Sequence, residues 1–472
     1  MLLLLQSAPL LLLLALLLSG RAGPVPACLA ALAASLPAIA LTLPEGSGTA
    51  VFLGTESLRA AFLAMQPIGV LAGGLIFHAA VTRLAPADQA PEEATPRRIF
   101  AATLLGGAFV ESVTGFAVGA VFALAQLRRM GLGGAPAAAM ALLALVMVPW
   151  GGLGPGTALG AALIGLPAQQ VALATAWPHA AWLLCLAPVL WRLCRAAGIV
   201  VPTGEKIAQL GMMALMAALL LGVNLFLPFE VAGIIGTGVP LLYVLWRLDP
   251  PRGALAWRRA LAALAPWAGL TAALLLARSW QGAPAVRPFA ELPAFPITHV
   301  AVVLWVFSLF LLLLRPGAFT AFGAAMGRAR RPALAMLLYV LLGRWLAGAG
   351  IAASLAEAAA AAMGPAAAYA MPVLGLVSGA VTGSNVGSNA ALMPVQAALG
   401  KAAGLPLQLA AGLHNFTGAA AAGMSFAVTA MVSSLAGGNA RPGAIWRLLL
   451  PSILAVLLIG WATLAIELSI PR

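Results

Sequence analysis

The sequence predicts an all-α polytopic membrane protein built as an inverted-topology repeat. The chain of 472 residues is 63% hydrophobic and 8% charged, and apolar stretches of near-spanning length recur from end to end. A Val-Thr-Gly tripeptide at 113–115 returns at 381–383, each time inside an apolar stretch. Backbone breaks at membrane depth persist only where they are buried in protein or line a cavity, so paired breaks indicate a transporter's binding site.

Charge and cysteine content exclude several classes of protein. The net charge of +13 comes largely from arginines that stand singly or in pairs between apolar runs, as in cytoplasmic loops, and not on a nucleic-acid-binding face. Cys28, Cys185 and Cys194 lie in apolar stretches and show neither a disulfide framework nor metal-ligand spacing. We therefore expect a lipid bilayer as a partner, and no nucleic acid, metal or cofactor.

The amino-terminal run is interpreted as the first span. Residues 1–20 are almost wholly apolar, but no positively charged region precedes them as in a signal peptide, so residues 1–24 are expected to remain as a membrane helix. Other apolar runs of similar length predict further plain helices. These are expected at 25–43, 60–83, 171–191, 206–227, 229–246, 259–279, 297–314, 332–350 and 446–468.

The arginines predict a re-entrant hairpin in the first half. Placing Arg83 and Arg97 in the cytoplasm leaves the amino terminus outside. If residues 99–127 simply crossed the membrane, Arg128 would lie outside, against the positive-inside tendency. A hairpin that turns at 111–116 returns Arg128 to the cytoplasm.

The second half predicts the mirror arrangement. There the stretch 366–399 starts from the outside, and a turn at 382–385 sends it back to the outside. The following stretch, 404–434, then crosses inward and delivers Arg441 to the cytoplasm. The two hairpins therefore enter from opposite faces.

Each hairpin precedes a stretch that is too long and too interrupted for one plain helix. Proline and clustered glycine at 148–156 interrupt residues 134–166, and the His-Asn-Phe-Thr-Gly run at 414–418 is interpreted as the interruption of 404–434. Both stretches are interpreted as broken helices, which brings the expected total to about twelve spans.

These elements predict three regions after the amino-terminal span. Residues 25–200 form the first repeat and 291–472 the second, so that 25–43 corresponds to 297–314 and 60–83 to 332–350 with opposite direction. The middle helices, 201–290, fall outside the repeat and are expected to serve as scaffold or as a contact between copies in a homo-oligomer.

The first hairpin carries a motif of a known family. The run Gly-Gly-Ala-Phe-Val-Glu at 106–111, followed by Gly115 and Phe116, resembles the Phe-x-Glu-Gly-Ala-Ala-Gly-Phe-Gly-Thr-Pro segment of the L-lactate permease family. It departs from that segment at Ser112 and Thr114, where the family has small apolar residues, and at 117–119, where Ala-Val-Gly replaces Gly-Thr-Pro. Membership of the family is therefore a stronger inference than lactate itself.

The second half carries two more likenesses to the same family. The run at 378–389, with Pro394 and Gln396, is similar to the family's Gly-Ser-x-x-x-Ser-Asn-x-x-x-x-Pro-x-Gln region, and His414-Asn415 has a counterpart in the segment that follows. The resemblance implies proton-coupled uptake of a 2-hydroxy monocarboxylate, such as lactate or glycolate, across the cytoplasmic membrane of a bacterium.

Two ionisable residues are candidates for proton coupling, and each has a structural alternative. Glu111 lies in an apolar segment at the hairpin turn, where desolvation favours a neutral carboxyl, or it caps the hairpin's own amides. His414 carries a proton or orients the substrate hydroxyl, or it is a hydrogen-bonded core histidine.

The hairpin turns supply the candidate substrate ligands. Hydroxyl and amide side chains beside freed backbone amides suit a small hydroxy acid or a sodium ion, and helix amino termini at a hairpin tip favour a carboxylate. The alternatives are that these polar groups bridge neighbouring helices, or that the threonine hydroxyls bond their own helix turn. The predicted ligands are Thr114, Gly115, Phe116, Thr382, Gly383, Ser384, Asn385, Ser388, Asn389, Asn415 and Arg344.

Arg344 has three possible roles. It lies late in the span 332–350, where it pairs with the substrate carboxylate, pairs with Glu111, or extends to the outer interface.

Three other functions compete with proton-coupled monocarboxylate uptake. A sodium-coupled di- or tricarboxylate transporter would use the Asn385 and Asn389 carbonyl groups, but a polyanion needs more fixed cations than Arg344. An enzyme is disfavoured, because the chain has four histidines, no His-x-x-x-His motif and no paired acidic motif. A channel would be distinguished by flux that neither saturates nor concentrates the substrate.

Overall fold

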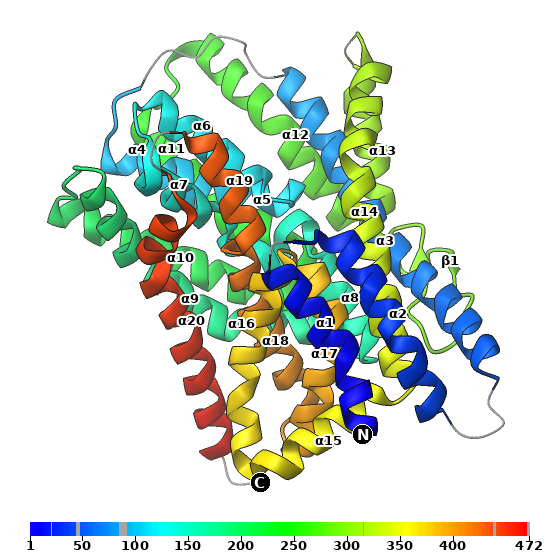
Figure 1. The fold of residues 1–472 in the computed structure, drawn as a ribbon. Coiled ribbons are helices and arrows are strands. Elements are labelled where there is room, and N and C mark those ends of the chain that lie inside the picture. Colours follow the sequence, from blue (N-terminus) through cyan, green and yellow to red (C-terminus); the bar gives the residue numbers. More distant parts are fainter. Residues whose placement is uncertain (20, 44–47, 85–91, 315, 438–439, 470–472) are drawn as a thin grey trace.

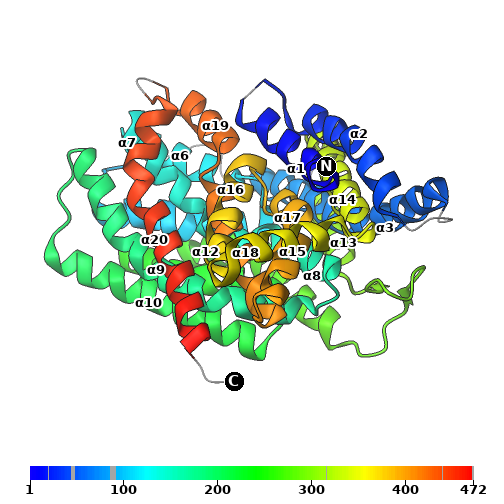
Figure 2. The same cartoon turned by 60° about the horizontal axis from the view of Figure 1, so that its bottom comes forward.

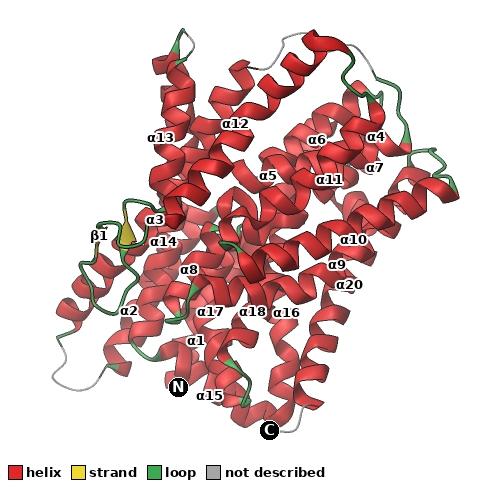
Figure 3. Ribbon diagram, turned by 180° about the vertical axis from the view of Figure 1, so that it is seen from behind, coloured by secondary structure: helices red, strands yellow, loops and turns green. Residues whose placement is uncertain are grey.

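The structure is a computed structural model that describes residues 1–19, 21–43, 48–84, 92–314, 316–437 and 440–469. Helices dominate it, beside one short antiparallel ribbon of β1 (Ala285–Val286) and β2 (Phe295–Pro296) (Figure 3). Within these residues nine helical segments are long and apolar enough to cross a membrane, and a bent pair makes a tenth. The shorter apolar helices α1 and α13, described below, bring the total to the twelve expected spans. The prediction of an all-α multi-pass membrane protein is confirmed.

The first half contains a helical hairpin followed by a broken helix, as predicted. The first arm of the hairpin begins with a π-helical stretch, which shifts the register of the helix before the turn. The helices are α1 (Leu2–Leu18), α2 (Pro24–Thr42), α3 (Thr49–Leu84), α4 (Pro96–Phe100), η1 (Ala101–Gly107), α5 (Ala108–Thr114), α6 (Val118–Arg129), α7 (Gly134–Leu142), η2 (Leu143–Leu153), α8 (Pro155–Leu163) and α9 (Ala168–Ala196).

Of the middle helices, α11 packs against the first hairpin, whereas α12 lies at the edge of the molecule. α12 exposes large apolar side chains such as Leu255, Leu261 and Leu276, which suits contact with lipid or with another copy of the chain. The elements are α10 (Thr203–Phe226), η3 (Phe229–Val231), α11 (Ala232–Leu248) and α12 (Gly253–Ser279).

The second half repeats the order of hairpin and broken helix. Its hairpin consists of α16 and α17, which are joined at Gly383 and Ser384 as the sequence predicts. The helices are α13 (Val300–Leu313), α14 (Ala318–Gly348), α15 (Ile351–Met363), η4 (Gly364–Ala370), α16 (Met371–Thr382), α17 (Asn385–Ala402), α18 (Leu407–Gly423), α19 (Phe426–Ala436) and α20 (Pro442–Ser469).

The two hairpins reach the middle of the molecule from opposite ends (Figure 1). The arm pair α5 and α6 descends from the end where α3 finishes, whereas α16 and α17 rise from the end that carries α15 (Figure 1). In the view of Figure 2, α15 to α18 lie between α1, α2 and α14 on one side and α9, α10 and α20 on the other. α3 and α14 pack in opposite directions, as expected for the helices at 60–83 and 332–350 (Figure 1).

Some predicted boundaries were wrong. α3 begins at Thr49 and α14 at Ala318, so both helices are longer than the apolar runs that predicted them. The sequence analysis also missed α15, which turns 67° from the axis of α14. Neither difference changes the direction of a predicted span.

The break in the second broken helix also lies elsewhere. Residues 414–418 are continuous helix within α18, and the chain breaks instead at Met424 and Ser425. Gly418 serves close packing, because a Cβ on it would lie 2.5 Å from Ser388 Oγ of α17. Gly418, which suggested a break in the helix, is therefore a point of close contact between two helices.

Candidate functional site

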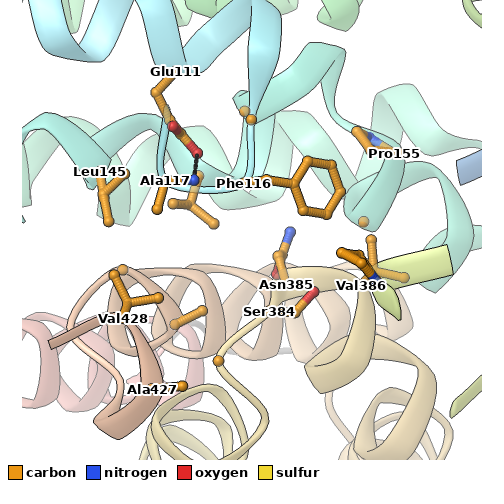
Figure 4. A pocket seen from close by; sticks show the side chains of 18 of the residues that line it. Glu111, Phe116, Ala117, Leu145, Pro155, Ser384, Asn385, Val386, Ala427 and Val428 are labelled. Atoms are coloured by element: carbon orange, nitrogen blue, oxygen red, sulfur yellow. Dashed lines mark hydrogen bonds between the residues drawn. The ribbon is translucent and has the colours of Figure 1, made fainter. Parts of the chain in front are cut away.

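A cavity of about 290 Å³ lies where the two hairpin tips meet (Figure 4). Phe116 of the first tip faces Ser384 and Asn385 of the second tip across it (Figure 4). Its remaining walls come from the broken segments η2/α8 and α18/α19, with Pro332 of α14. The lining residues are Glu111, Gly115, Phe116, Ala117, Leu145, Val148, Gly151, Pro155, Gly156, Pro332, Gly383, Ser384, Asn385, Val386, Ala422, Gly423, Ala427, Val428 and Met431.

The first tip is a turn of three consecutive residues with positive φ. Gly115, Phe116 and Ala117 have φ of 65°, 58° and 62°, and two of them are not glycine. Side chains rarely adopt this conformation, so the surrounding structure must hold the turn in place.

Glu111 holds that turn. Its Oε1 accepts a hydrogen bond from the Ala117 amide at 3.1 Å, and its Oε2 accepts one from the Gly119 amide at 3.0 Å. The residue is only 3% exposed. The capping geometry considered from the sequence is therefore present, and the same carboxyl group lines the cavity. Its role in proton coupling stays a prediction.

Gly119 allows the two arms of the first hairpin to touch. A Cβ at this position would lie 2.2 Å from the Gly107 carbonyl oxygen and 2.7 Å from the Glu111 Cβ. Gly119 thus brings α6 close to η1 and α5 at the first tip.

The second tip is capped by a neutral side chain. Ser384 precedes α17, and its Oγ accepts from the Gly387 amide at 3.4 Å. Gly383 makes the turn with a φ of 66°. The predicted ligands Ser384 and Asn385 line the cavity beside the amino terminus of α17.

Four helices start at the cavity. Residues in the first turn or at the N-cap of α6, α8, α17 and α19 line it, among them Ala117, Pro155, Asn385 and Val428. The first amides of an α-helix have no partner within the helix, and each amino terminus carries about half a positive elementary charge. Among the described lining residues, Glu111 is the one ionisable side chain. Backbone amides, not basic side chains, therefore make the cavity attractive to an anion.

An asparagine network behind the second tip joins the two halves of the chain. Asn415 Oδ1 accepts from Asn385 Nδ2 at 3.0 Å and from Asn389 Nδ2 at 2.9 Å. Asn415 Nδ2 donates to the hydroxyls of Thr157 and Thr175, both at 2.9 Å. The network fixes α17 and α18 against α8 and α9. The Oδ1 atoms of Asn385 and Asn389 are buried and accept no hydrogen bond from the described residues.

His414 and Ser388 form a second buried group between α17 and α18. His414 Nε2 lies 3.2 Å from the Ser388 carbonyl oxygen, and the Ser388 hydroxyl donates to Ser378 Oγ at 3.0 Å. Neither residue is among those that line the cavity. His414 therefore has the hydrogen-bonded core geometry that was one of its two interpretations.

The two repeated threonines point back to their own helices. Thr114 Oγ1 donates to the Val110 carbonyl oxygen at 2.7 Å, and Thr382 Oγ1 donates to the Ser378 carbonyl oxygen at 2.8 Å and also lies 3.1 Å from the Ser384 carbonyl oxygen of the tip. Neither residue is among those that line the cavity. The geometry is that of the local hydrogen bond considered as their alternative role.

Arg344 lies away from the predicted ligands. Its Nε donates to Glu56 Oε2 of α3 at 2.8 Å, and it is not among the residues that line the cavity. Glu56 also pairs with Arg59. The partner of Arg344 is thus neither Glu111 nor a group at the tips.

The sequence analysis missed the contribution of α19. Ser425 Oγ accepts from the Val428 amide at 3.3 Å, which starts α19 beside the cavity. A serine three residues before that valine is a recognisable N-cap signal. It was overlooked because the break was expected at 414–418.

The fold and the cavity define a class: a multi-pass membrane protein with the architecture of a transporter. A family model described as L-lactate permease matches residues 290–469, which confirms the resemblance that the motifs at 378–389 and 414–415 predicted. No curated protein matches the chain. Among solved structures, the chain is similar to the YdaH transporter of Alcanivorax borkumensis, whose topology is described as unusual, with 18% identity over 89% of this chain and 87% of that chain and a TM-score of 0.45.

Proposed function

We propose that this protein is a secondary active transporter of the bacterial cytoplasmic membrane that imports a small 2-hydroxy monocarboxylate, lactate or glycolate, by proton symport. The observation that carries the proposal is the meeting of four helix amino termini at a cavity between two opposed hairpin tips. The family match over residues 290–469 supports the choice of a lactate-like substrate.

The cavity suits a small monoanion. Its volume of about 290 Å³ is at the lower end of small-molecule sites, which run from about 300 Å³ upward. The amides at the starts of α17 and α19 would bind the carboxylate, and Ser384 and Asn385 offer a hydroxyl and an amide for the substrate hydroxyl.

Glu111 provides a physical basis for proton coupling. An ionised carboxylate at the cavity repels a second anion, whereas a protonated one does not. Protonation also turns one oxygen from an acceptor into a donor, which releases the amide of Ala117 or Gly119. The substrate anion and the proton would therefore enter together.

The remaining predicted ligands fall into two groups, those that would touch the substrate and those that would act from behind the cavity wall. Gly115, Phe116 and Gly383 shape the cavity directly. Thr114, Thr382, Ser388, Asn389, Asn415 and His414 would act by holding the tips, and Arg344 would hold α14 to α3.

A second candidate function is favoured by one observation. The Oδ1 atoms of Asn385 and Asn389 are buried without a donor, and carbonyl oxygens of this kind are ligands for sodium. A sodium-coupled di- or tricarboxylate transporter is therefore the alternative. The described lining residues include no Lys or Arg to balance a polyanion, so we prefer the proton-coupled monoanion.

Transport in proteoliposomes tests both. We expect saturable accumulation of labelled L-lactate driven by an inward proton gradient without sodium, abolished by a protonophore and competed by glycolate but not by citrate. Absence of lactate uptake, with accumulation of citrate once sodium is added, would replace the first function with the second.

A further inference from the structure

A second cavity, of about 250 Å³, lies on the other side of the first broken helix. Gly151 and Pro155 line the central cavity, while Leu153 and Pro155 line the second one. The unwound segment 151–155 is thus the partition between them. Leu153 in it has a φ of 67°, between two glycines that also have positive φ, so the partition is a strained backbone and not a helix.

The polar wall of this second cavity combines three residues that can donate, Arg278, His299 and Gln66, with the carboxylate of Glu230. Arg278 of α12 lines it and forms an ion pair with Glu230 of η3. His299 Nδ1 accepts from the Ala301 amide at 3.1 Å, so a neutral ring carries its hydrogen on Nε2 and can donate it. Gln66 also lines the cavity, and its buried Nε2 donates to none of the described residues.

The second cavity belongs to the outer end of the protein. α12 begins next to Arg247 and Arg252, which the positive-inside rule assigns to the cytoplasm, and Arg278 lies at its opposite end. The segment 280–299, which carries β1 and β2, joins the end of α12 that carries Arg278 to the start of α13.

We infer that this second cavity is an outer anion subsite, in which a small carboxylate binds Arg278, His299 and Gln66 before it passes the segment 151–155 into the central cavity. An arriving carboxylate competes with Glu230 for the Arg278 guanidinium. The ion pair therefore occupies the subsite while it is empty, and Arg278 binds the carboxylate once the pair opens. The anion preference is independent of the proposed function, while the identity of the carboxylate as the transported substrate rests on it.

Thiol labelling measures the anion preference without transport. Ala158 lines the second cavity, so Ala158→Cys is made in a background whose three native cysteines are replaced by alanine. An exposed control is Ala285→Cys in β1. Each thiol reacts with an anionic sulfonatoethyl and a cationic trimethylammonioethyl methanethiosulfonate. Because the Arg278–Glu230 pair has no net charge, the decisive comparison is made in Glu230→Gln. There we expect the anion-to-cation rate ratio to be at least about fivefold higher at position 158 than at position 285, as for one partly screened charge nearby.

Charge variants identify the group responsible. Glu230→Gln frees Arg278 and should raise the ratio at position 158, whereas Arg278→Gln leaves Glu230 unpaired and should lower it. Because an unpaired buried carboxylate destabilises the protein, the double variant Arg278→Gln/Glu230→Gln is measured too and should lose the increase seen in Glu230→Gln. Equal ratios at positions 158 and 285 in Glu230→Gln, or a ratio that responds to neither substitution, would overturn the subsite.

Protection by L-lactate separates this inference from the proposed function. External lactate should slow labelling at position 158 and leave position 285 unchanged. An anion preference without protection and without uptake would retain an anion subsite but reject lactate as the substrate. Normal lactate uptake without any anion preference would reject the subsite and retain the function.

Discussion

The two hairpin tips have the same backbone plan but different chemistry. In the first, a buried carboxylate, Glu111, accepts from the amides of Ala117 and Gly119. In the second, the neutral Ser384 hydroxyl caps α17 and an asparagine network supports it. Only the first tip can change its charge as the pH changes. The comparison teaches that an inverted repeat can place one titratable and one neutral tip at the same cavity.

The largest effect is expected from removing the charge of the first tip. Glu111→Gln should abolish proton-driven accumulation of lactate while folded protein stays in the membrane, because the side chain can no longer gain or lose a proton. The glutamine NH2 group also places a donor opposite one backbone N–H, and this unsatisfied donor pair costs about 1–3 kcal/mol of stability. Uptake into proteoliposomes and thermal unfolding in detergent measure the two effects.

Counterflow provides the control for this variant. Exchange of labelled for unlabelled lactate needs no net proton movement and should continue in Glu111→Gln. Normal concentrative uptake by the variant would remove Glu111 from the coupling role and leave it as a cap only.

A glycine pair tests how tightly the first tip is packed. Gly119→Ala should destabilise the protein by about 1–3 kcal/mol or more, because its Cβ would lie 2.2 Å from the Gly107 carbonyl oxygen. Gly133→Ala, after the same hairpin, meets nothing within 4 Å and has an extended φ of −148°, so it should change stability by less than about 0.5 kcal/mol. Equal melting temperatures for both variants would contradict the packing argument.

A substitution behind the second tip should lower the affinity for substrate and leave the pH dependence of uptake unchanged. Asn415→Ala removes the acceptor for Asn385 Nδ2 and one acceptor for Asn389 Nδ2, at a cost of about 1–3 kcal/mol. We expect a higher KM for uptake with an unchanged pH profile. Gln408→Ala, on an exposed position of the same helix, is the matched control. A shifted pH profile would show that the neutral tip also takes part in coupling.

The smallest effect is expected at the repeated threonines. Thr114→Val and Thr382→Val remove hydroxyls that donate to carbonyl groups of their own helices, so each should cost less than about 1 kcal/mol and leave KM unchanged. A several-fold rise in KM for either variant would restore the predicted direct contact with substrate.

Much of the fold could be predicted because it depends on local properties of the chain. Apolar length predicts spans, and the arginines next to the span at 60–83 and the hairpin at 99–127 predict direction. The turns near Gly115 and Gly383 could be found because a break inside an apolar segment is unusual. The break at Ser425 was missed because glycines in α18 serve helix packing, and sequence alone does not separate that use from a turn.

The sequence by itself determined the class of the protein, the opposite entry of the two hairpins and the family likeness of the motifs at 378–389 and 414–415. Only the tertiary structure decided which polar groups meet. Thr114 and Thr382 bond their own helices, Arg344 pairs with Glu56 and not with Glu111, and four helix amino termini share one cavity. The physical reason is that hydropathy and charge act on each segment separately, whereas hydrogen-bond partners depend on the packing of segments hundreds of residues apart.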